Sequence, residues 1–413
     1  MQVFLLQRSP KQAIRNRAVP CYCDHSVGNL VSLKQQSKTL KPSRSRTVDC
    51  KLAATGWNTE TRRALEKLIR QGAGKGLPAV FDFDNTIQHG DIQEATLGVL
   101  ARSGRLTPAS LAGQLSPSFT TAHRGLVDLE SCVDILEYYK ELLSPTTHGT
   151  SDPAPLTTGY AWAIEALGGL RLAEVVRATQ EVCAIAKANQ HDVISVTPGK
   201  TAFSVPRFYP EMVELLSELI RHRFDIWIIS ASNVWSVRWM VVRELNPRLR
   251  AGGGEIAPDH VIGASTLLAD AEGRLYKDSV LVKQDTGYAE MKAEALGAFR
   301  LTHHLEFPLP AYSGKVACVF DAIGRQPYLC AGDGPGDHAM LRISQHRLWI
   351  ARQGATAVAS DAAQSDRGSR KTRLMIQASH SARTHGFSAR AISVLPRGIP
   401  TQPAPEFLNS DPP

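Results

Sequence analysis

No run of apolar residues in this 413-residue chain approaches the length of about 20 residues that a membrane-spanning helix needs. The apolar stretch at residues 3–6 is also too short to form the core of a signal peptide. We therefore expect a cytoplasmic protein that has no membrane partner.

Cysteines are few and carry no recognisable pattern. The chain has seven, an odd number, and their spacings match no zinc motif. Only Cys21 and Cys23 are close together, and most of the others stand in apolar contexts. We expect reduced thiols, as is usual for cytosolic proteins.

Acidic residues are scarce at both ends of the chain, which explains most of its net charge of +8. Residues 1–50 have nine lysines and arginines against two aspartates, and residues 353–413 carry +3, which leaves −2 for residues 51–352. The body thus offers no basic patch for a nucleic acid. Residues 1–50 resemble an organellar transit peptide in charge, but their prolines and weak amphipathicity favour a disordered extension. We expect residues 353–413, which are rich in Ser, Ala, Arg and Pro, to be mostly disordered.

Between these ends, apolar strands alternate with helices, which is typical of a three-layer α/β sandwich with a parallel, Rossmann-like sheet. The pattern predicts strands at 79–83, 225–229, 260–264, 328–331 and 347–351, and core helices at 58–70, 210–221, 232–245 and 315–323. Residues 51–87 and 207–352 would form this core. The insert at 88–206 predicts a mainly helical cap domain, with helices at 92–100, 129–143, 159–167 and 172–188.

Four short motifs supply the parts of a phosphoryl-transfer site. Asp82 and Asp84 follow the first predicted strand, at the sheet edge where open α/β folds bind ligands. One carboxylate can attack phosphorus while the other protonates the leaving group and later deprotonates water. Asp333 offers a third carboxylate, and Lys315 a point charge for the nucleophile and the phosphoryl oxygens. So many carboxylates repel a phosphate, which predicts a hard divalent cation, Mg²⁺.

Oxygen-binding groups complete this set. Ser230 ends an apolar run at a strand-to-helix turn, where its hydroxyl and nearby backbone N–H groups such as that of Ala231 can hold phosphoryl oxygens. Each motif alone is weak: a lone serine, a lone lysine and a Gly-Asp-Gly-Pro-Gly turn are all common. Their occurrence together and in this order favours a functional site.

These motifs resemble those of the haloacid dehalogenase-like phosphatase superfamily, in the branch that includes phosphoserine phosphatases. The resemblance covers residues 76–352 and rests on Asp82, Asp84, Thr86, Ser230, Lys315, Asp333 and Asp337. It implies that Thr86, Ser230 and Ala231 bind phosphate. Because members that cleave carbon–halogen bonds lack a second acid at the place of Asp84, it favours phosphate esters as substrates.

The resemblance also implies individual roles. Asp82 would be the nucleophile and Asp84 the general acid and base. Mg²⁺ would be held by Asp82, the main-chain carbonyl of Asp84 and Asp333. Asp337 would orient Lys315 and a metal-bound water.

A closer resemblance is to phosphorylcholine phosphatases within that branch, carried by residues 82–87 and 91–95. It implies that Asp91 and Glu94 face a cationic head group, with cap aromatics as further candidates: Tyr138, Tyr139, Tyr160 and Trp162. Two readings remain open, because acidic residues also favour a helix N-terminus and the aromatics also suit the core of the cap. Gln88 departs from the aromatic residue that would suit a quaternary ammonium.

We therefore expect a Mg²⁺-dependent phosphomonoesterase that hydrolyses a small ester such as phosphorylcholine or phosphoethanolamine through an aspartyl-phosphate, as a monomer or homodimer. One alternative is a phosphoserine phosphatase, whose cap would present a cation from Arg102, Arg105 or Arg124 to the substrate carboxylate. Others are a phosphotransferase and a non-catalytic binding protein whose basic ends contact an acidic partner.

Overall fold

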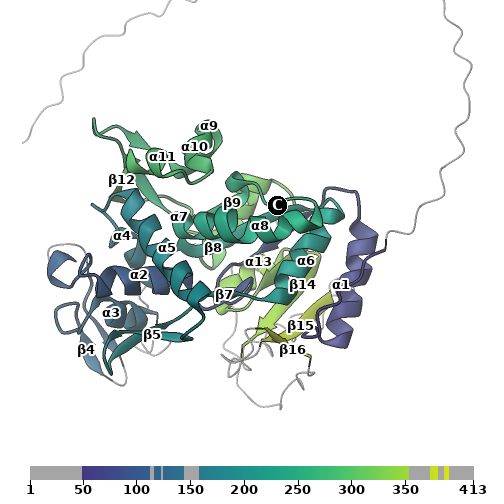
Figure 1. The fold of residues 1–413 in the computed structure, drawn as a ribbon, viewed down its shortest axis with the longest axis horizontal. Helices are drawn as coiled ribbons and strands as arrows, with labels where there is room; N and C mark the ends of the chain where they lie inside the picture. The colour runs from purple at the N-terminus through teal and green to yellow at the C-terminus, as the bar shows by residue number, and fades with distance from the viewer. Residues whose placement is uncertain are drawn as a thin grey trace, which may run out of the picture. The chain divides into compact units, whose positions relative to one another are not determined.

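A seven-stranded sheet organises the described part of the chain, which in this computed structural model comprises residues 49–111, 116–121, 124–143, 158–352, 373–379 and 386–389 (Figure 1). The strands run in the order β16 (Phe387–Ser388), β15 (Arg373–Ser379), β14 (His346–Ala351), β13 (Leu329–Gly332), β1 (Pro78–Phe81), β8 (Asp225–Asn233) and β9 (Val261–Ala264). All neighbours pair in parallel except β15 and β16. The predicted α/β class is confirmed.

The strands in the middle of the sheet are apolar on both faces, because helices cover both. Ala79 and Phe81 pack with helices α1 (Thr59–Gly72) and α6 (Pro210–Arg221), whereas Val80, between them in sequence, packs with the opposite layer. That second layer contains α12 (Ser313–Cys318), the following π-helix η6 (Val319–Ile323) and α13 (His338–Arg342). The alternation of side chains along one strand thus builds the three layers.

Several helix ends follow local sequence rules. Asn58 caps α1, and its side-chain oxygen accepts hydrogen bonds from the backbone of Glu60 and Thr61 at 2.9 and 3.3 Å. Pro210 stands at the first position of α6, where a missing N–H costs nothing. β8 runs four residues past its predicted end, so the helix expected at 232–245 begins only at Val234, as α7 (Val234–Trp239) and the π-helix η3 (Met240–Leu245).

The chain leaves the core after β1 and returns before α6 through a two-stranded ladder of β2 (Gln88–His89) and β7 (Arg207–Phe208). Between these strands lie helices α2 (Ile92–Arg102), α3 (Ile135–Leu142), α4 (Thr158–Glu165) and α5 (Leu172–Ala188). Two hairpins, β3 (Phe119–Thr121) with β4 (Gly125–Val127) and β5 (Val193–Thr197) with β6 (Thr201–Ser204), complete this insert. The helix expected at 129–143 is shorter, because Asp134 caps α3 and starts it there.

A second insertion, which we call the β10–β12 module, lies between β9 and α12. Its sheet contains β10 (Thr266–Ala269), β11 (Leu275–Tyr276) and β12 (Arg300–Leu305), with the short helices α9 (Asp278–Gln284), α10 (Thr286–Ala289) and α11 (Ala293–Gly297). The expected turn at 272–274 joins β10 and β11, with Gly273 at a φ of 79°. Figure 1 shows α9 and α10 on the same side of the core as β12.

Two strands lie in the segment that we expected to be mostly disordered. β15 pairs with β14 over six residue pairs, and Gln377 Oε1 accepts a hydrogen bond of 2.9 Å from the backbone N–H of Asn58. The sheet therefore extends beyond residue 352.

Two further expectations concern membranes and thiols. Within the described residues, no helix combines the length and apolar character needed to cross a bilayer. The five cysteines that can be described are buried and unbonded to one another: Cys50, Cys132, Cys183, Cys318 and Cys330. Cys21 and Cys23 lie outside the described residues.

Candidate active site

The first and fourth motifs meet because β1 and β13 are parallel neighbours. The N–H of Asp82 donates to the carbonyl of Ala331 at 3.0 Å, so the ladder continues past Phe81 and places Asp82 beside the start of the fourth motif. Both strands end at the same edge of the sheet. Asp82 and Asp333 are each buried there, and Thr86 bridges them, with its Oγ1 3.0 Å from Asp82 Oδ2 and 3.4 Å from Asp333 Oδ1.

Lys315 lies at the centre of the cluster. Its Nζ donates to Asp82 Oδ1 at 2.5 Å and to Asp337 Oδ1 at 2.6 Å, and its side chain is almost completely buried. Burial alone would lower the pKa of this lysine, but Asp337 and Asp82 raise it above the ordinary value, so the ammonium stays charged. The helix that carries it starts close to the preceding loop, since a Cβ at Gly314 would lie against the Leu309 carbonyl oxygen.

Asp337 holds the loop of the fourth motif in place. Its Oδ2 accepts hydrogen bonds of 3.0 Å from the backbone N–H groups of Asp333 and Gly334. A Cβ at Gly332 would lie 2.5 Å from the Cβ of Asp337, so a glycine is required for this approach. Asp337 thereby fixes both the lysine and the carboxylate of Asp333.

Three carboxylates converge in this cluster. Ligand oxygens of Asp82, Asp333 and Asp337 lie within 4.8 Å of one another. Burial raises the pKa of both Asp82 and Asp333, and the charges of neighbouring aspartates raise it further, while Lys315 opposes this for both. Asp333 Oδ2 receives no hydrogen bond, although Arg352 Nε forms an ion pair with it at 2.7 Å.

The cluster fits a hard divalent cation. Its donors are carboxylate oxygens, which Mg²⁺ prefers, and three carboxylates face only two cations. Asp82 and Asp333 are therefore suited to hold Mg²⁺, as the sequence analysis proposed. Asp337 spends both oxygens on Lys315 and on backbone N–H groups, in keeping with an indirect role.

Asp84 is held by donors from three elements. Its Oδ1 accepts from Gln88 Nε2 at 2.9 Å and from the Ile92 N–H at 2.8 Å, and its Oδ2 accepts from Ser232 Oγ at 2.6 Å. Burial raises the pKa of Asp84, and these hydrogen bonds oppose the rise. A carboxyl group of raised pKa is suited to donate a proton.

The second motif lies beside Asp84 rather than beside Asp82. Ser230 Oγ is 3.5 Å from Asp84 Oδ2 and accepts a hydrogen bond of 3.1 Å from the Ser232 N–H. Ala231 is half-buried on the same stretch of β8, where the pairing with β9 becomes irregular. Thr86, Ser230 and Ala231 thus surround the carboxylates, and their contact with phosphate stays a prediction.

The two acidic candidates for a head group differ. Asp91 caps α2, with Oδ1 2.8 Å from the Glu94 N–H, and has no ion-pair partner among the described residues. Burial raises its pKa well above the ordinary value, with contributions from Asp84 and Glu94. Glu94 pairs with Lys140 at 2.9 Å, so its charge is already neutralised. Asp91 is therefore the better-placed group for a substrate cation.

The aromatic candidates also divide. Tyr138 and Trp162 are buried, 4.8 Å apart between ring centroids, and bond to Pro117 and Ser116, which assigns them to the core of the insert. Tyr139 stacks on Trp162 in the same core. Tyr160 instead lies 6.3 Å from the Tyr312 ring, and the charges of Asp91 and Lys315 both affect its pKa, so it faces the cluster.

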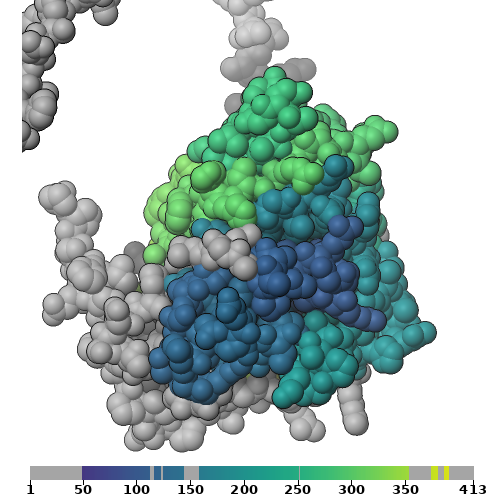
Figure 2. All heavy atoms as spheres, turned by 90° about the vertical axis from the view of Figure 1, so that its left-hand side faces the viewer, coloured from purple at the N-terminus to yellow at the C-terminus, as the bar shows by residue number. Residues whose placement is uncertain are grey.

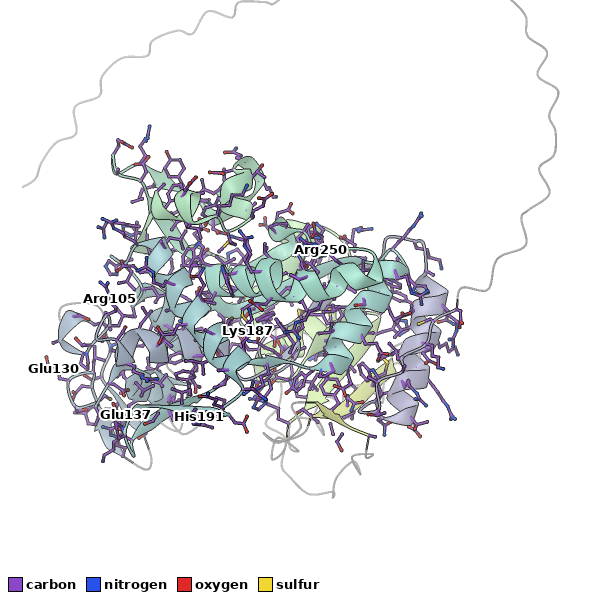
Figure 3. The ribbon with its side chains drawn as sticks, viewed as in Figure 1. Arg105, Glu130, Glu137, Lys187, His191 and Arg250 are labelled. Atoms are coloured by element: carbon purple, nitrogen blue, oxygen red, sulfur yellow. The ribbon has the colours of Figure 1, made fainter. Side chains whose placement is uncertain are left out.

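The arginines that would bind a substrate carboxylate lie elsewhere. Arg105 pairs with Glu174 at 3.1 Å, Arg124 pairs with Glu137 at 2.8 Å, and Arg102 is exposed. Figure 3 labels Arg105 and Glu137 at the edge of the insert, away from the sheet. None of the three contacts the carboxylate cluster.

Four contributors to the site were absent from the sequence analysis: Gln88, Ser232, Tyr312 and Arg352. Tyr312 has a φ of 53°, a region that non-glycine residues seldom adopt, directly before α12. Arg352 follows β14, and the expected signal was its place after a buried strand. Gln88 and Ser232 become visible only through the hydrogen bonds that they donate to Asp84.

The fold and this set of carboxylates and lysine define the haloacid dehalogenase-like phosphatase superfamily, and the chain belongs to it. A relative by sequence is phosphorylcholine phosphatase of Pseudomonas aeruginosa, 27% identical over 312 residues, which are 72% of this chain and 81% of that protein. No protein-family model matches the chain.

Solved structures share the fold. A conserved protein of unknown function from Anaerococcus prevotii is 20% identical and covers 82% of this chain and 97% of its own, with a TM-score of 0.54. A phospho-aspartyl intermediate analogue of phosphoserine phosphatase is 12% identical over 73% of this chain and 92% of its own, with a TM-score of 0.36.

Proposed function

We propose that this protein is a Mg²⁺-dependent phosphomonoesterase that works through an aspartyl-phosphate on Asp82. The observation that carries the proposal is the position of Lys315 Nζ, within 2.6 Å of both Asp82 and Asp337. A charged, buried lysine keeps one oxygen of Asp82 oriented and provides positive charge for the phosphoryl oxygens. Mg²⁺ held by Asp82, Asp333 and the main-chain carbonyl of Asp84 would supply further positive charge there.

Two protein carboxylates would perform the reaction. Asp82 attacks phosphorus, and the bond from phosphorus to the ester oxygen breaks as Asp84 donates its proton to the leaving alkoxide. The Asp84 carboxylate then takes a proton from water, which attacks phosphorus and releases inorganic phosphate from Asp82. The contacts of Asp84 with Gln88 and Ser232 support this role, because they hold the carboxyl group in one orientation.

We further propose a small ester with a cationic amine, such as phosphorylcholine or phosphoethanolamine. Asp91 supports this choice, since an unpaired carboxylate of raised pKa next to the catalytic cluster gains from a substrate cation. The rings of Tyr160 and Tyr312 offer faces of the kind that bind quaternary ammonium groups. The name of the Pseudomonas relative agrees with this substrate class.

The other functions considered are less well supported. A phosphoserine phosphatase would need a cation for the substrate carboxylate, and the three cap arginines considered for this role point elsewhere. A phosphotransferase would share the same site, and an added alcohol acceptor distinguishes it from a hydrolase by its phosphorylated product. A purely binding role leaves the Lys315–Asp82–Asp337 arrangement without purpose.

A substrate panel tests the proposal. Phosphate release in Mg²⁺ would be measured with phosphorylcholine, phosphoethanolamine, phosphoserine, sugar phosphates and nucleotides. We expect the two amine esters to be preferred and the Asp84→Asn variant to bind them but turn over very slowly. Turnover of Asp84→Asn at the normal rate would remove the acid and base role from this residue.

A further inference from the structure

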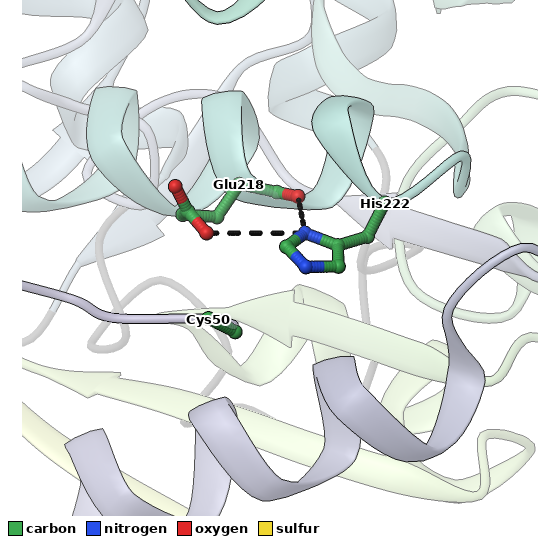
Figure 4. Close-up of side chains that lie close together, drawn as sticks. All are labelled: Cys50, Glu218 and His222. Atoms are coloured by element: carbon green, nitrogen blue, oxygen red, sulfur yellow. Dashed lines mark hydrogen bonds and ion pairs between the residues drawn. The ribbon is translucent and has the colours of Figure 1, made fainter. Parts of the chain in front are cut away.

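A second group of metal-ligating side chains lies at the other edge of the sheet, remote from the carboxylate cluster. It consists of Cys50, before α1, and of Glu218 and His222 at the carboxyl end of α6 (Figure 4). One ligand atom from each lies within 4.8 Å of the other two. Because His222 stands three residues before β8 begins, the group lies at the amino ends of the strands, whereas the active site lies at their carboxyl ends.

His222 is prepared to act as a ligand. Its Nδ1 lies 2.7 Å from the backbone carbonyl of Glu218, and a carbonyl only accepts, so Nδ1 carries the proton. Nε2 therefore has a free lone pair, yet it is buried and has no hydrogen-bond partner. A histidine that donates one ring N–H to a backbone carbonyl and leaves the other nitrogen free is the usual arrangement at metal centres.

The other two ligands are held from outside the cluster. Arg221 Nη2 lies 2.5 Å from Glu218 Oε2 and 2.9 Å from the Asp49 carbonyl oxygen. Arg70 Nη1 donates to the Cys50 carbonyl at 3.2 Å. A carboxylate has about four lone-pair positions, so Glu218 can accept from Arg221 and still bind a cation. These contacts fix the backbone around Cys50 and the carboxylate in advance.

We propose that Cys50, Glu218 and His222 form a binding site for a divalent transition-metal ion of the Zn²⁺ type. Sulfur, imidazole nitrogen and carboxylate oxygen are the donors that Zn²⁺ takes, and three protein ligands leave the fourth position of a tetrahedron for water. On binding, the Cys50 thiol loses its proton to solvent and ligates as thiolate.

The position of the group suggests a structural role. Cys50 belongs to the segment that leads into α1, while Glu218 and His222 belong to α6, and both helices cover the same face of the sheet. An ion bound to all three would join these two segments. It would also hold the end of α6 directly before β8, the strand that carries Ser230 and Ser232 at its far end.

The alternative is a hydrogen-bonded thiol that binds no metal. Burial, reinforced by the Glu218 carboxylate, raises the pKa of the Cys50 thiol to about 12. In that case the thiol stays protonated and donates to Glu218, and cobalt or zinc at stoichiometric amounts leaves Cys50 unchanged.

Cobalt titration of the metal-stripped full-length protein separates the two. Co²⁺ replaces Zn²⁺ and gives a thiolate-to-cobalt charge-transfer band in the near ultraviolet, which the carboxylates of the active site cannot produce. We expect a band that saturates at one equivalent, is displaced by Zn²⁺ and is lost in Cys50→Ser and in His222→Gln. The matched controls, Cys132→Ser and the double variant Cys21→Ser/Cys23→Ser, are expected to retain it.

Thermal unfolding gives a second measurement that does not depend on how well Cys50→Ser folds. With saturating Mg²⁺ present, added Zn²⁺ is expected to raise the Tm of the unmodified protein but not that of Glu218→Gln or His222→Gln. Absence of the cobalt band in excess Co²⁺, or a band that persists in Cys50→Ser, would overturn the proposal.

Discussion

Ser232 Oγ lies 2.6 Å from Asp84 Oδ2, closer than Ser230, the serine of the second motif, which is 3.5 Å away. The hydroxyl that orients the proposed general acid is thus two residues beyond the one that the motif indicates. Ser230 is left to contact the backbone N–H of Ser232 and, in our proposal, the phosphoryl oxygens.

Replacing Ser232 by alanine tests this assignment. A hydrogen bond to a charged group contributes about 1.5–3 kcal/mol, so we expect kcat to fall by roughly ten- to a hundredfold while KM changes little. Steady-state kinetics on the preferred ester measures both constants. Ser217→Ala, which removes a hydroxyl that bonds only to the Val213 carbonyl of α6, serves as the matched control. Equal losses in the two variants would contradict the orienting role.

Arg352 is expected to compete with Mg²⁺ for Asp333. Its Nε faces Asp333 Oδ2 at 2.7 Å, and its side chain is 45% exposed, so it can turn away when a metal binds. In Arg352→Gln the cluster becomes more negative, and we expect the Mg²⁺ concentration for half-maximal activity to fall by about two- to fivefold, a small effect because of solvent screening. Arg325→Gln, which alters an exposed pair with Asp225, is the control. A higher Mg²⁺ requirement would show that Arg352 instead supports metal binding.

Asp91 is expected to recognise the positive charge of the substrate. Asn preserves the side-chain oxygen that caps α2, so Asp91→Asn removes the charge with little effect on folding. We expect KM for phosphorylcholine to rise by about tenfold or more, equivalent to about 1.4 kcal/mol. The uncharged isostere 3,3-dimethylbutyl phosphate provides the comparison, and its KM is expected to stay constant. A parallel rise for both esters would rule out charge recognition by Asp91.

The buried pair Arg238–Asp278 is expected to hold the β10–β12 module on the core. Arg238 donates to both oxygens of Asp278 at 2.8 and 2.7 Å, and the Tyr288 hydroxyl donates to Asp278 at 2.6 Å. Arg238→Met leaves a buried charge unpaired, and we expect the free energy of unfolding to fall by about 3–5 kcal/mol. Urea denaturation measures this change.

An exposed pair in the same module is the control for Arg238. Arg274 bonds to Asp270 at 2.6 Å, but its side chain is 66% exposed, so Arg274→Met is expected to cost less than about 1 kcal/mol. The double variant Arg238→Met/Asp278→Leu is expected to recover part of the stability, because it leaves no unpaired charge. Equal stability of the two single arginine variants would contradict the proposed role of the buried pair.

The sequence predicted best those elements whose residues are buried on both sides. β1, β8 and β13 are continuous apolar runs, and each ends in a residue of the site. β15 escaped prediction because its seven residues lie in a segment whose average composition is polar. The β10–β12 module escaped it because its helices, at four to seven residues, are too short for a helical period to show.

The same distinction applies to the site. The sequence predicted that Asp82, Lys315, Asp333 and Asp337 belong to one site, and the structure brings them together through the adjacency of β1 and β13. The donors to Asp84 are set by loop geometry, which no residue pattern records. The ion pair of Glu94 with Lys140 likewise depends on how α2 and α3 pack.

The most direct test of the central claim is to trap phosphate on the protein. The enzyme would be mixed with ³²P-labelled phosphorylcholine in Mg²⁺, quenched in acid within milliseconds and mapped by peptide digestion. We expect acid-stable label on the peptide that contains Asp82, increased in Asp84→Asn if dephosphorylation slows most, and none in Asp82→Asn. Label on another residue, or undiminished turnover by Asp82→Asn, would contradict the account.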